Sequence, residues 1–380
     1  MTPTRSTCAL LVLGAGALLA SCSAGATAAR AEQQAEREEA KEAQLAALEV
    51  AAAGGDLAAQ MELASMYYDG RIVAEDRGKA AVWYRAAADQ GLAEAYYSLG
   101  VLLEKGEGVP QDPEGAVRAY RVAAEAGVAE AQTNLGFMAL RGEGMAADKD
   151  EAFRWLSAAA DHGVAEAQFV LGSMVADGRG TAPDAAAAAT LYEEAARQGL
   201  GPAQEALAMA LLVGAGVERD PALAARWLEQ AAEQGSTPAR ERLGLLLIRG
   251  AEGLAKDPAR GAGWLREAAE AGAPTSQYNL GLLHIRGDGV ERSDQLAHRW
   301  FLAAAEQGLS EAQVRAGAMS EAGRGVRKDE VEAARWYMIA GRQGNAGALR
   351  RLEALDPRLT DAQRSAARER ALEWERARRR

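Results

Sequence analysis

The apolar and polar residues of this chain repeat with a period of 36 residues between Asp56 and Gly344. In the second copy, Leu92–Gly127, the residues Ala95, Leu99 and Leu102 share one helical face because they are spaced at i, i+4 and i+7. A glycine-bearing turn follows, and a second apolar stripe then ends at Gly127. Each copy therefore predicts two helices joined by a turn.

Eight such copies follow one another, and we number each of them from position 1 to position 36. Position 36 is always a glycine: Gly91, Gly127, Gly163, Gly199, Gly235, Gly272, Gly308 and Gly344. Seven copies have 36 residues, and the sixth has one extra residue between Gly250 and Gly253. A period in this range is typical of stacked two-helix units, so the predicted fold class is all-α, a right-handed α-solenoid.

The second helix of each copy is predicted to begin after position 21, which always holds a good helix-capping residue. These residues are Asp76, Asp112, Asp148, Asp184, Asp220, Asp257, Ser293 and Asp329. Their side chains can accept a hydrogen bond from an unpaired backbone N–H of the first helical turn. Pro113, Pro221 and Pro258 follow three of them, at the helical position where proline costs least.

Two further positions predict how the helices pack. Position 9 is glycine in six copies, although glycine inside a helix costs roughly 1 kcal/mol relative to alanine. We infer that a partner helix approaches position 9 too closely for a larger side chain. Position 28 holds six of the seven tryptophans: Trp83, Trp155, Trp227, Trp264, Trp300 and Trp336. The alanines at positions 32 and 33 lie on the same face, which favours a core between repeats over an exposed ligand-stacking surface.

These residues together carry a family resemblance. The pattern A-E-A-Q-x-x-L-G, followed by G-x-G-V, an aspartate, a tryptophan and a final A-A-x-x-G, resembles the Sel1-like repeat, a relative of the tetratricopeptide repeat. The match covers residues 56–344, and its departures are few: Ala64 and Ile72 replace glycines, Ser293 replaces aspartate, and the sixth turn is longer. The resemblance implies a stack of tetratricopeptide-like hairpins.

Residues 1–22 have the pattern of an export signal. Arg5 precedes an apolar run over Cys8–Leu18, and Leu19-Ala20-Ser21-Cys22 follows. A run of this length is typical of a secretory signal and too short to span a bilayer. The last four residues resemble a bacterial lipobox, which implies that Cys22 is lipid-modified; the alternative is an ordinary signal peptide with a chance cysteine. Ser23 stands where aspartate would retain a Gram-negative lipoprotein at the inner membrane, which implies an outer-membrane lipoprotein that faces the periplasm.

The predicted domain organisation follows from these patterns. Residues 1–21 form the signal peptide, and residues 22–55 form a lipidated tether and an N-terminal capping helix that includes Ala43–Ala53. The eight repeats occupy residues 56–344, and residues 345–380 form C-terminal capping helices and a basic tail. Thr360 and Gln363 predict a capping box for the last helix, in which Leu372 and Trp374 supply apolar side chains for docking.

The charge of the chain argues against a nucleic-acid partner. The net charge is −11, although residues 364–380 contain seven arginines and only three glutamates. An acidic solenoid binds nucleic acid poorly, because that affinity depends on neutralising phosphates. The basic tail is interpreted as a solvated helical end, with contact to an anionic lipid headgroup or an acidic partner as the alternative.

No group of residues predicts catalysis, so we expect a protein that is not an enzyme. His162, His284 and His298 occupy unrelated positions, and none has a metal-ligand spacing. Once the signal is removed and Cys22 is acylated, no cysteine remains as a nucleophile. The G-x-G pairs recur between helices with no preceding strand, so they predict turns and not phosphate-binding loops. We therefore predict no cofactor, no metal site and no small-molecule substrate.

The predicted function is a scaffold that binds a partner protein of the cell envelope along a concave surface lined by first helices. Positions 5 and 12, together with the aromatic residues of the first two copies, are the candidate contacts, because glutamine can bind a peptide backbone and tyrosine is enriched at binding hot spots. The candidate partner-binding residues are Gln60, Tyr67, Tyr96, Gln132, Gln168, Gln204, Arg240, Gln277, His284 and Gln313. The alternatives are a peptidoglycan- or β-lactam-acting enzyme or binder, and a scaffold subunit of an exopolysaccharide secretion system.

Overall fold

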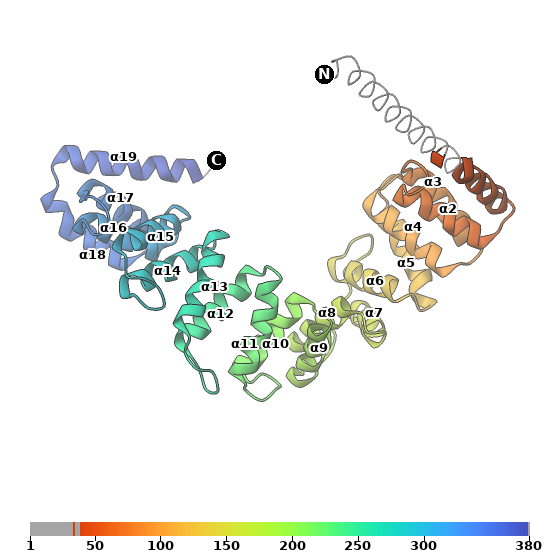
Figure 1. The fold of residues 1–380 in the computed structure, drawn as a ribbon, viewed down its shortest axis with the longest axis horizontal. Coiled ribbons are helices and arrows are strands. Elements are labelled where there is room, and N and C mark those ends of the chain that lie inside the picture. Colours follow the sequence, from red (N-terminus) through yellow and green to blue (C-terminus); the bar gives the residue numbers. More distant parts are fainter. Residues whose placement is uncertain (1–32, 35–38, 379–380) are drawn as a thin grey trace, which may run out of the picture. The chain divides into compact units, whose positions relative to one another are not determined.

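The structure is a computed structural model that describes residues 33–34 and 39–378 (Figure 1). The signal peptide and Cys22 lie outside the described residues. The helices form two compact units, Met1–His162 and Gly163–Arg380. The described residues contain no β-strand, and only an isolated bridge joins Ala251 to Leu254. The predicted all-α solenoid of two-helix repeats is confirmed.

Each repeat consists of a first helix and a second helix that runs back beside it (Figure 1). The first helices are α2 (Leu57–Asp69), α4 (Ala93–Lys105), α6 (Ala129–Arg141), α8 (Ala165–Asp177), α10 (Gly201–Val213), α12 (Thr237–Arg249), α14 (Pro274–Arg286) and α16 (Ser310–Ala322). The second helices are α3 (Arg77–Asp89), α5 (Pro113–Glu125), α7 (Lys149–Asp161), α9 (Ala185–Arg197), α11 (Pro221–Glu233), α13 (Pro258–Glu270), α15 (Asp294–Glu306) and α17 (Glu330–Arg342).

The capping residues define the boundaries of the second helices as predicted. At position 21 of all eight repeats, the Asp or Ser side chain accepts a hydrogen bond from a backbone N–H in the first turn of the second helix. The backbone N–H of the same residue also donates to the carbonyl of position 12, as Asp220 does to Leu211 at 3.0 Å. Position 21 therefore ties the start of the second helix to the first helix of the same repeat.

The glycines of the turn allow neighbouring repeats to pack closely against each other. Gly289, at position 17 of the seventh repeat, has a φ of 71°. A β-carbon at this residue would lie 2.1 Å from the carbonyl oxygen of Pro258, in the first turn of the preceding second helix. The G-x-G pair is thus a turn that packs against the backbone of the preceding repeat, as its periodic recurrence predicts.

The close approach predicted at position 9 is also confirmed. A β-carbon at Gly281 would lie 2.7 Å from the ring of Phe301, which belongs to the second helix of the same repeat. The corresponding distance from Gly100 to the ring of Tyr120 is 2.6 Å. Position 9 is therefore glycine because the large side chain at position 29 fills the space beside it.

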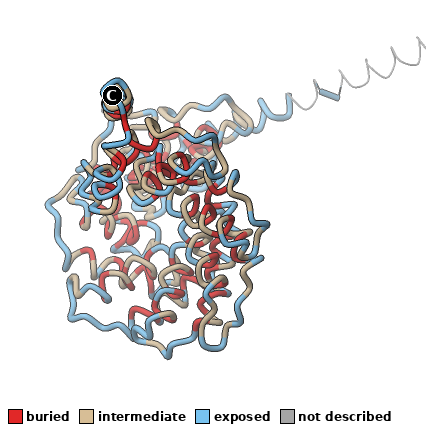
Figure 2. Tube along the Cα trace, turned by 90° about the vertical axis from the view of Figure 1, so that its left-hand side faces the viewer, coloured by how far each residue is buried: buried red, intermediate tan, exposed pale blue. Residues whose placement is uncertain are grey.

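Buried residues lie along the sides of the helices that face other helices, and the turns are exposed (Figure 2). The tryptophans of position 28 belong to this core, as predicted. Trp227 and Trp264, for example, pack against a cluster that includes Leu207, Leu228 and Leu243. Only Trp336 is fully buried, however, whereas the other five tryptophans of this position are half-buried.

Helices outside the eight repeats cover both ends of the array. Residues 39–53 are helical, and Leu45, Leu48 and Ala52 from this helix pack against the first repeat. At the other end follow α18 (Ala346–Leu355), the 3₁₀ turn η1 (Asp356–Arg358) and α19 (Asp361–Arg378). The expected capping box is present, because the Thr360 N–H donates to Gln363 Oε1 and the Gln363 N–H donates to Thr360 Oγ1.

Candidate functional site: the exposed face of the first helices

Most of the predicted partner-binding residues lie inside the array. The glutamines of position 5 are at most 6% exposed: Gln60, Gln132, Gln168, Gln204, Gln277 and Gln313. Their side chains face neighbouring helices, and they cannot line a surface that contacts a partner. The prediction that these glutamines bind a partner is therefore wrong.

The buried glutamines join each repeat to its neighbour. The Nε2 of Gln277 donates to the carbonyl of Ala269 in the preceding second helix at 3.0 Å, and its Oε1 accepts from Gln307 at 2.8 Å. The Ala269 carbonyl also accepts from the Gly272 N–H at 3.0 Å, so the glutamine fills its second acceptor position. Arg240 replaces glutamine in the sixth repeat and donates from Nε to the Ala232 carbonyl at 3.1 Å. Arg240 is thus also an internal link and not a candidate partner contact.

The other predicted contacts need similar correction. Tyr67 is 6% exposed, and its hydroxyl donates to Glu49 at 3.1 Å. His284 is 5% exposed, and its Nδ1 lies 2.9 Å from the Glu291 carbonyl oxygen. Tyr96 is half-buried and packs against the alanines of α3. Position 12 therefore faces the second helix of its own repeat instead of a groove.

Replacing one of these glutamines is expected to weaken the joint between two repeats. In Gln204→Ala, the Ala196 carbonyl and the Gln234 amide lose their buried partner, which should cost about 1–3 kcal/mol. Urea unfolding followed by circular dichroism measures this loss. Gln295→Ala, on an exposed part of α15, is the control and should change stability by less than about 0.5 kcal/mol. Equal effects of the two substitutions would contradict the proposed link.

The surface that is open to a partner consists of positions 3, 6, 7, 10, 13 and 14, which we call the first-helix face. In unit Met1–His162 this face has a depression of about 180 Å³ that is lined by Tyr68, Tyr84, Tyr97, Ser98 and Val101. Burial raises the pKa of Tyr84 and of Tyr97, so both phenols stay protonated at neutral pH. The aromatic-rich copies thus have an open depression, which is lined by Tyr68 and Tyr97 and not by Tyr67 and Tyr96.

Tyr84 contributes a ring that the sequence analysis did not select. It belongs to the second helix α3 at position 29, where a large side chain fills the space beside the first helix. Because position 9 is Ala64 in this repeat and position 13 is Tyr68, the ring also reaches the depression. Tyr84 itself is only 7% exposed, and its position in a second helix gave no signal that it borders the depression.

In unit Gly163–Arg380 the first-helix face combines apolar side chains with arginines. Half-buried apolar residues follow one another at positions 10 and 13: Leu245, Ile248, Leu282 and Ile285. The exposed residues Arg249, Arg286 and Arg315 lie at the same face and make no ion pair within the described part of the chain. A second depression of about 300 Å³ is lined by Tyr278, Glu311, Val314, Arg315, Ala318, Asn345 and Arg351.

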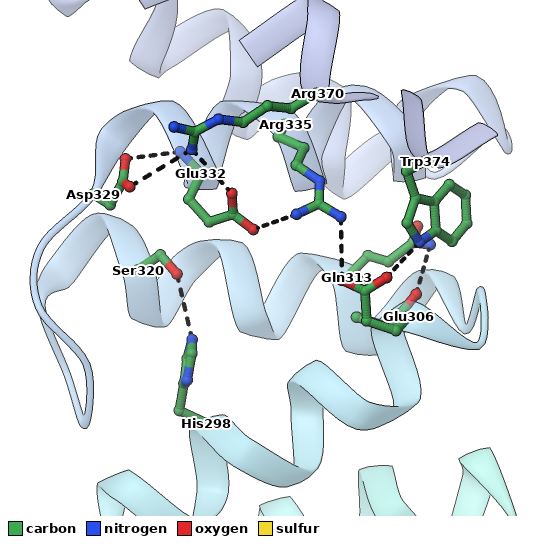
Figure 3. A network of polar contacts seen from close by, with 10 residues as sticks. His298, Glu306, Gln313, Ser320, Asp329, Glu332, Arg335, Arg370 and Trp374 are labelled. Atoms are coloured by element: carbon green, nitrogen blue, oxygen red, sulfur yellow. Dashed lines mark hydrogen bonds and ion pairs between the residues drawn. The ribbon is translucent and has the colours of Figure 1, made fainter. Parts of the chain in front are cut away.

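A cavity near the C-terminal end of the array contains a histidine and a serine, but not in the arrangement of a nucleophilic serine site. It has a volume of about 650 Å³ and lies between α15, the turn before α17 and the start of α19. His298 Nε2 lies 3.4 Å from Ser320 Oγ (Figure 3), but no described residue binds the other ring nitrogen of His298. A nucleophilic serine requires a histidine that a third group orients, and Ser320 is itself only 2% exposed. The described residues also contain no group of three or more metal-ligating side chains.

Acidification is expected to destabilise the last repeats through His298. Burial lowers the pKa of His298 below its ordinary value of 6.5. The unfolded chain then binds the proton more readily than the folded chain does, so the free energy of unfolding falls as the pH drops below about 6.5. His298→Ala, with the alanine that five other repeats have at position 26, should lose this pH dependence. Denaturant unfolding at pH 7.5 and pH 5.5 measures it, and identical slopes for both proteins would contradict the prediction.

The fold and the exposed first-helix face define a helical-repeat scaffold. A family model described as the Sel1 repeat matches residues 57–92, 93–128, 129–164, 165–200, 201–236, 237–272, 274–309 and 310–345. These segments cover more than half of the sequence, and the chain therefore belongs to the Sel1 repeat family. Sel1 repeat proteins are typically scaffolds for protein–protein interaction and are usually not enzymes.

Two solved structures support this assignment. A Sel1 repeat protein from Oxalobacter formigenes is 31% identical, with a TM-score of 0.62, and the alignment covers 82% of this chain and 91% of that chain. The protein c5321, a protective antigen of uropathogenic Escherichia coli with an SLR fold, is 28% identical, with a TM-score of 0.52. That alignment covers 86% of this chain and 85% of the antigen. A comparison with curated proteins found no match.

Within residues 33–34 and 39–378, no helix combines the length and the apolar character that are needed to cross a bilayer.

Proposed function

We propose that this protein is a lipid-anchored scaffold of the bacterial cell envelope that binds a partner protein on its first-helix face. The observation that supports this most directly is the depression lined by Tyr68, Tyr84 and Tyr97. Tyrosine is enriched at the energetic centres of protein interfaces because a large apolar ring carries a polar hydroxyl. The apolar and arginine side chains of the first-helix face in repeats 6–8 extend the same kind of surface.

The proposed location follows from the lipobox-like sequence that ends in Cys22. Several acyl chains on this cysteine, at ~0.8 kcal/mol for each buried CH₂ group, would hold the protein permanently on a membrane. Ser23 favours the outer membrane, with the repeats in the periplasm. With Cys22 acylated, the mature chain has no free thiol and forms no disulfide, and an array of this length is stabilised by its own core.

Site-specific photocrosslinking tests the binding face. A photoreactive amino acid at Ser98 or at Asn279, both half-buried at position 7, should crosslink a protein partner in intact cells. The control positions are Val82, which is 64% exposed on α3, and Leu296, which is 40% exposed on α15. Crosslinks at the control positions alone would contradict the first-helix face as the binding site, and no crosslink at any position would contradict the scaffold function.

A cysteine substitution tests the anchor separately. Cys22→Ala removes the acylation site and is expected to move the protein from the membrane fraction to the soluble periplasmic fraction. Membrane fractionation and metabolic labelling with a fatty acid measure this change. Continued membrane attachment of Cys22→Ala would refute the anchor but would leave the binding face untouched.

A further inference from the structure

The last helix, α19, packs on the outer surface of two second helices, α15 and α17, and so shows that this surface can bind a helix. α19 packs mainly along α17 and meets α18 only near the end of that helix, where Ala367 and Leu355 share a core cluster, so it is not the second helix of a ninth hairpin. Its Trp374 ring meets the Trp336 ring edge-on, with the ring centres 6.1 Å apart. The small side chains of Ala367 and Ala371 are fully buried in the same contact. This arrangement buries Trp336 completely.

Polar contacts from Arg370 and Trp374 hold α19 against the neighbouring helices (Figure 3). Trp374 Nε1 donates to Glu306 at 2.6 Å, and Arg370 lies 3.4 Å from Glu332 and 3.8 Å from Asp329. Arg335 joins the two carboxylates, at 2.8 Å from Glu332 and 3.1 Å from Glu306. One turn further on, Glu375 pairs with Arg342 at 2.7 Å. The residues that receive α19, which we call the α17 surface, are Glu306, Asp329, Glu332, Arg335, Trp336 and Arg342.

The same set of residues recurs at the end of the second repeat and in the second helix of the third. By repeat position, Glu306, Asp329, Glu332, Arg335 and Trp336 correspond to Glu125, Asp148, Glu151, Arg154 and Trp155. No other repeat of the eight has all five. One residue differs in charge, because Asp161 stands where the α17 surface has Arg342. We call these six residues, Glu125 from α5 and five from the second half of the third repeat, the α7 surface.

The α7 surface is open in its own unit, where no helix lies along α7 as α19 lies along α17. Trp155 is half-buried whereas Trp336 is fully buried, and Glu125, Asp148 and Arg154 are exposed. The Glu151 carboxylate already has two partners on this surface: Arg121 lies 2.6 Å away, and Trp155 Nε1 donates to it at 3.3 Å. The surface thus presents a tryptophan face among carboxylates.

We propose that the α7 surface is a second docking site, for a basic amphipathic helix of a partner protein. The helix would resemble α19 in carrying an arginine and, four residues later, a tryptophan, which would meet Asp148 and Trp155. It would differ from α19 in carrying a basic residue instead of Glu375, because that position faces Asp161. Four carboxylates face only two arginines, Arg154 and the neighbouring Arg121, so the surface attracts a cationic helix and disfavours an anionic membrane.

A pair of peptides tests this proposal on the purified full chain. Both span residues 360–378, one with the native sequence and one with Glu375→Arg, and fluorescence anisotropy measures their dissociation constants. The Glu375→Arg peptide is expected to bind the chain more tightly, by roughly threefold or more, because a like-charge contact with Asp161 becomes an opposite-charge contact. Asp161→Arg in the chain should reverse the preference of the two peptides.

Further variants identify the site of binding. Glu125→Arg, an exposed substitution that leaves the core intact, should weaken binding of the Glu375→Arg peptide at least threefold, and Trp155→Ala should weaken it more. Trp227→Ala is the matched control, since it changes the same repeat position without the four carboxylates, and should have no effect. Unchanged binding in Glu125→Arg and Trp155→Ala would overturn the proposal. Tighter binding of the native peptide would overturn the basic helix as occupant and would indicate a second copy of α19 instead.

Discussion

Trp336→Ala is expected to destabilise the C-terminal end of the array by about 3–5 kcal/mol. Trp336 is fully buried between α17 and α19, and its ring contacts both the Trp374 ring and the Arg335 guanidinium, which lies 4.3 Å from the ring centre. The substitution leaves a cavity that the rigid backbone of α17 cannot fill. It also removes the apolar contact on which α19 docks, so α19 should leave its position.

Hydrogen exchange followed by mass spectrometry measures this effect locally, because a repeat array need not unfold in one step. We expect α17 and α19 to lose protection in Trp336→Ala while α10 and α11 keep theirs. Trp227→Ala, at the same repeat position but half-buried, should have a smaller effect that is confined to its own neighbours. Unchanged protection of α19 in Trp336→Ala would show that the ion pairs alone hold this helix.

Gly289→Ala is expected to destabilise the junction between the sixth and seventh repeats by about 3 kcal/mol. The φ of Gly289 is 71°, a conformation that costs an alanine roughly 1–2 kcal/mol. A β-carbon would in addition lie 2.1 Å from the oxygen and 2.3 Å from the carbon of the Pro258 carbonyl. Overpacking of this kind costs typically 1–3 kcal/mol, since the helix backbone would have to move.

Gly272→Ala separates the two contributions. Gly272 has a φ of 95°, but no heavy atom lies within 4 Å of where its β-carbon would stand. Its substitution should therefore show the conformational cost alone. Thermal unfolding of the two variants measures the difference, and an equal effect would show that the turn does not press on the preceding repeat.

Local features of the repeat could be predicted from the sequence because their causes lie within one hairpin. A capping aspartate such as Asp220 satisfies an N–H three residues away, and Gly281 is explained by the Phe301 ring of its own repeat. The periodic recurrence of both residue types made the prediction specific. The same holds for the capping box of Thr360 and Gln363, which spans only three residues.

The accessible surface could not be predicted in the same way, because it depends on the neighbouring repeat. A glutamine such as Gln277 is polar and suggests exposure, but its partner is the Ala269 carbonyl at the end of the preceding helix. A one-position error around a helix is enough to exchange a buried for an exposed side chain. Tyr97 therefore lines the depression, whereas its neighbour Tyr96 packs against α3.

The position of α19 also depends on interactions between distant residues. Its sequence indicated a docking helix with Leu372 and Trp374, but it did not indicate the site, because Glu306 lies 68 residues from Trp374. A ninth hairpin would have placed α19 beside α18. The tryptophan contact and the carboxylates of α15 and α17 favour the second helices instead.

The hydrogen bonds of the buried glutamines Gln132, Gln204, Gln277 and Gln313 have the same direction, from a donor in one repeat to a carbonyl in the repeat before it. A hairpin with this glutamine therefore has a donor for the repeat before it and a carbonyl acceptor for the repeat after it. A duplicated repeat of 36 residues could therefore be inserted between two existing repeats without any compensating substitution. Unequal recombination can thus lengthen or shorten such a gene in whole repeats while the protein stays folded, and the reach of the scaffold can change faster than its sequence.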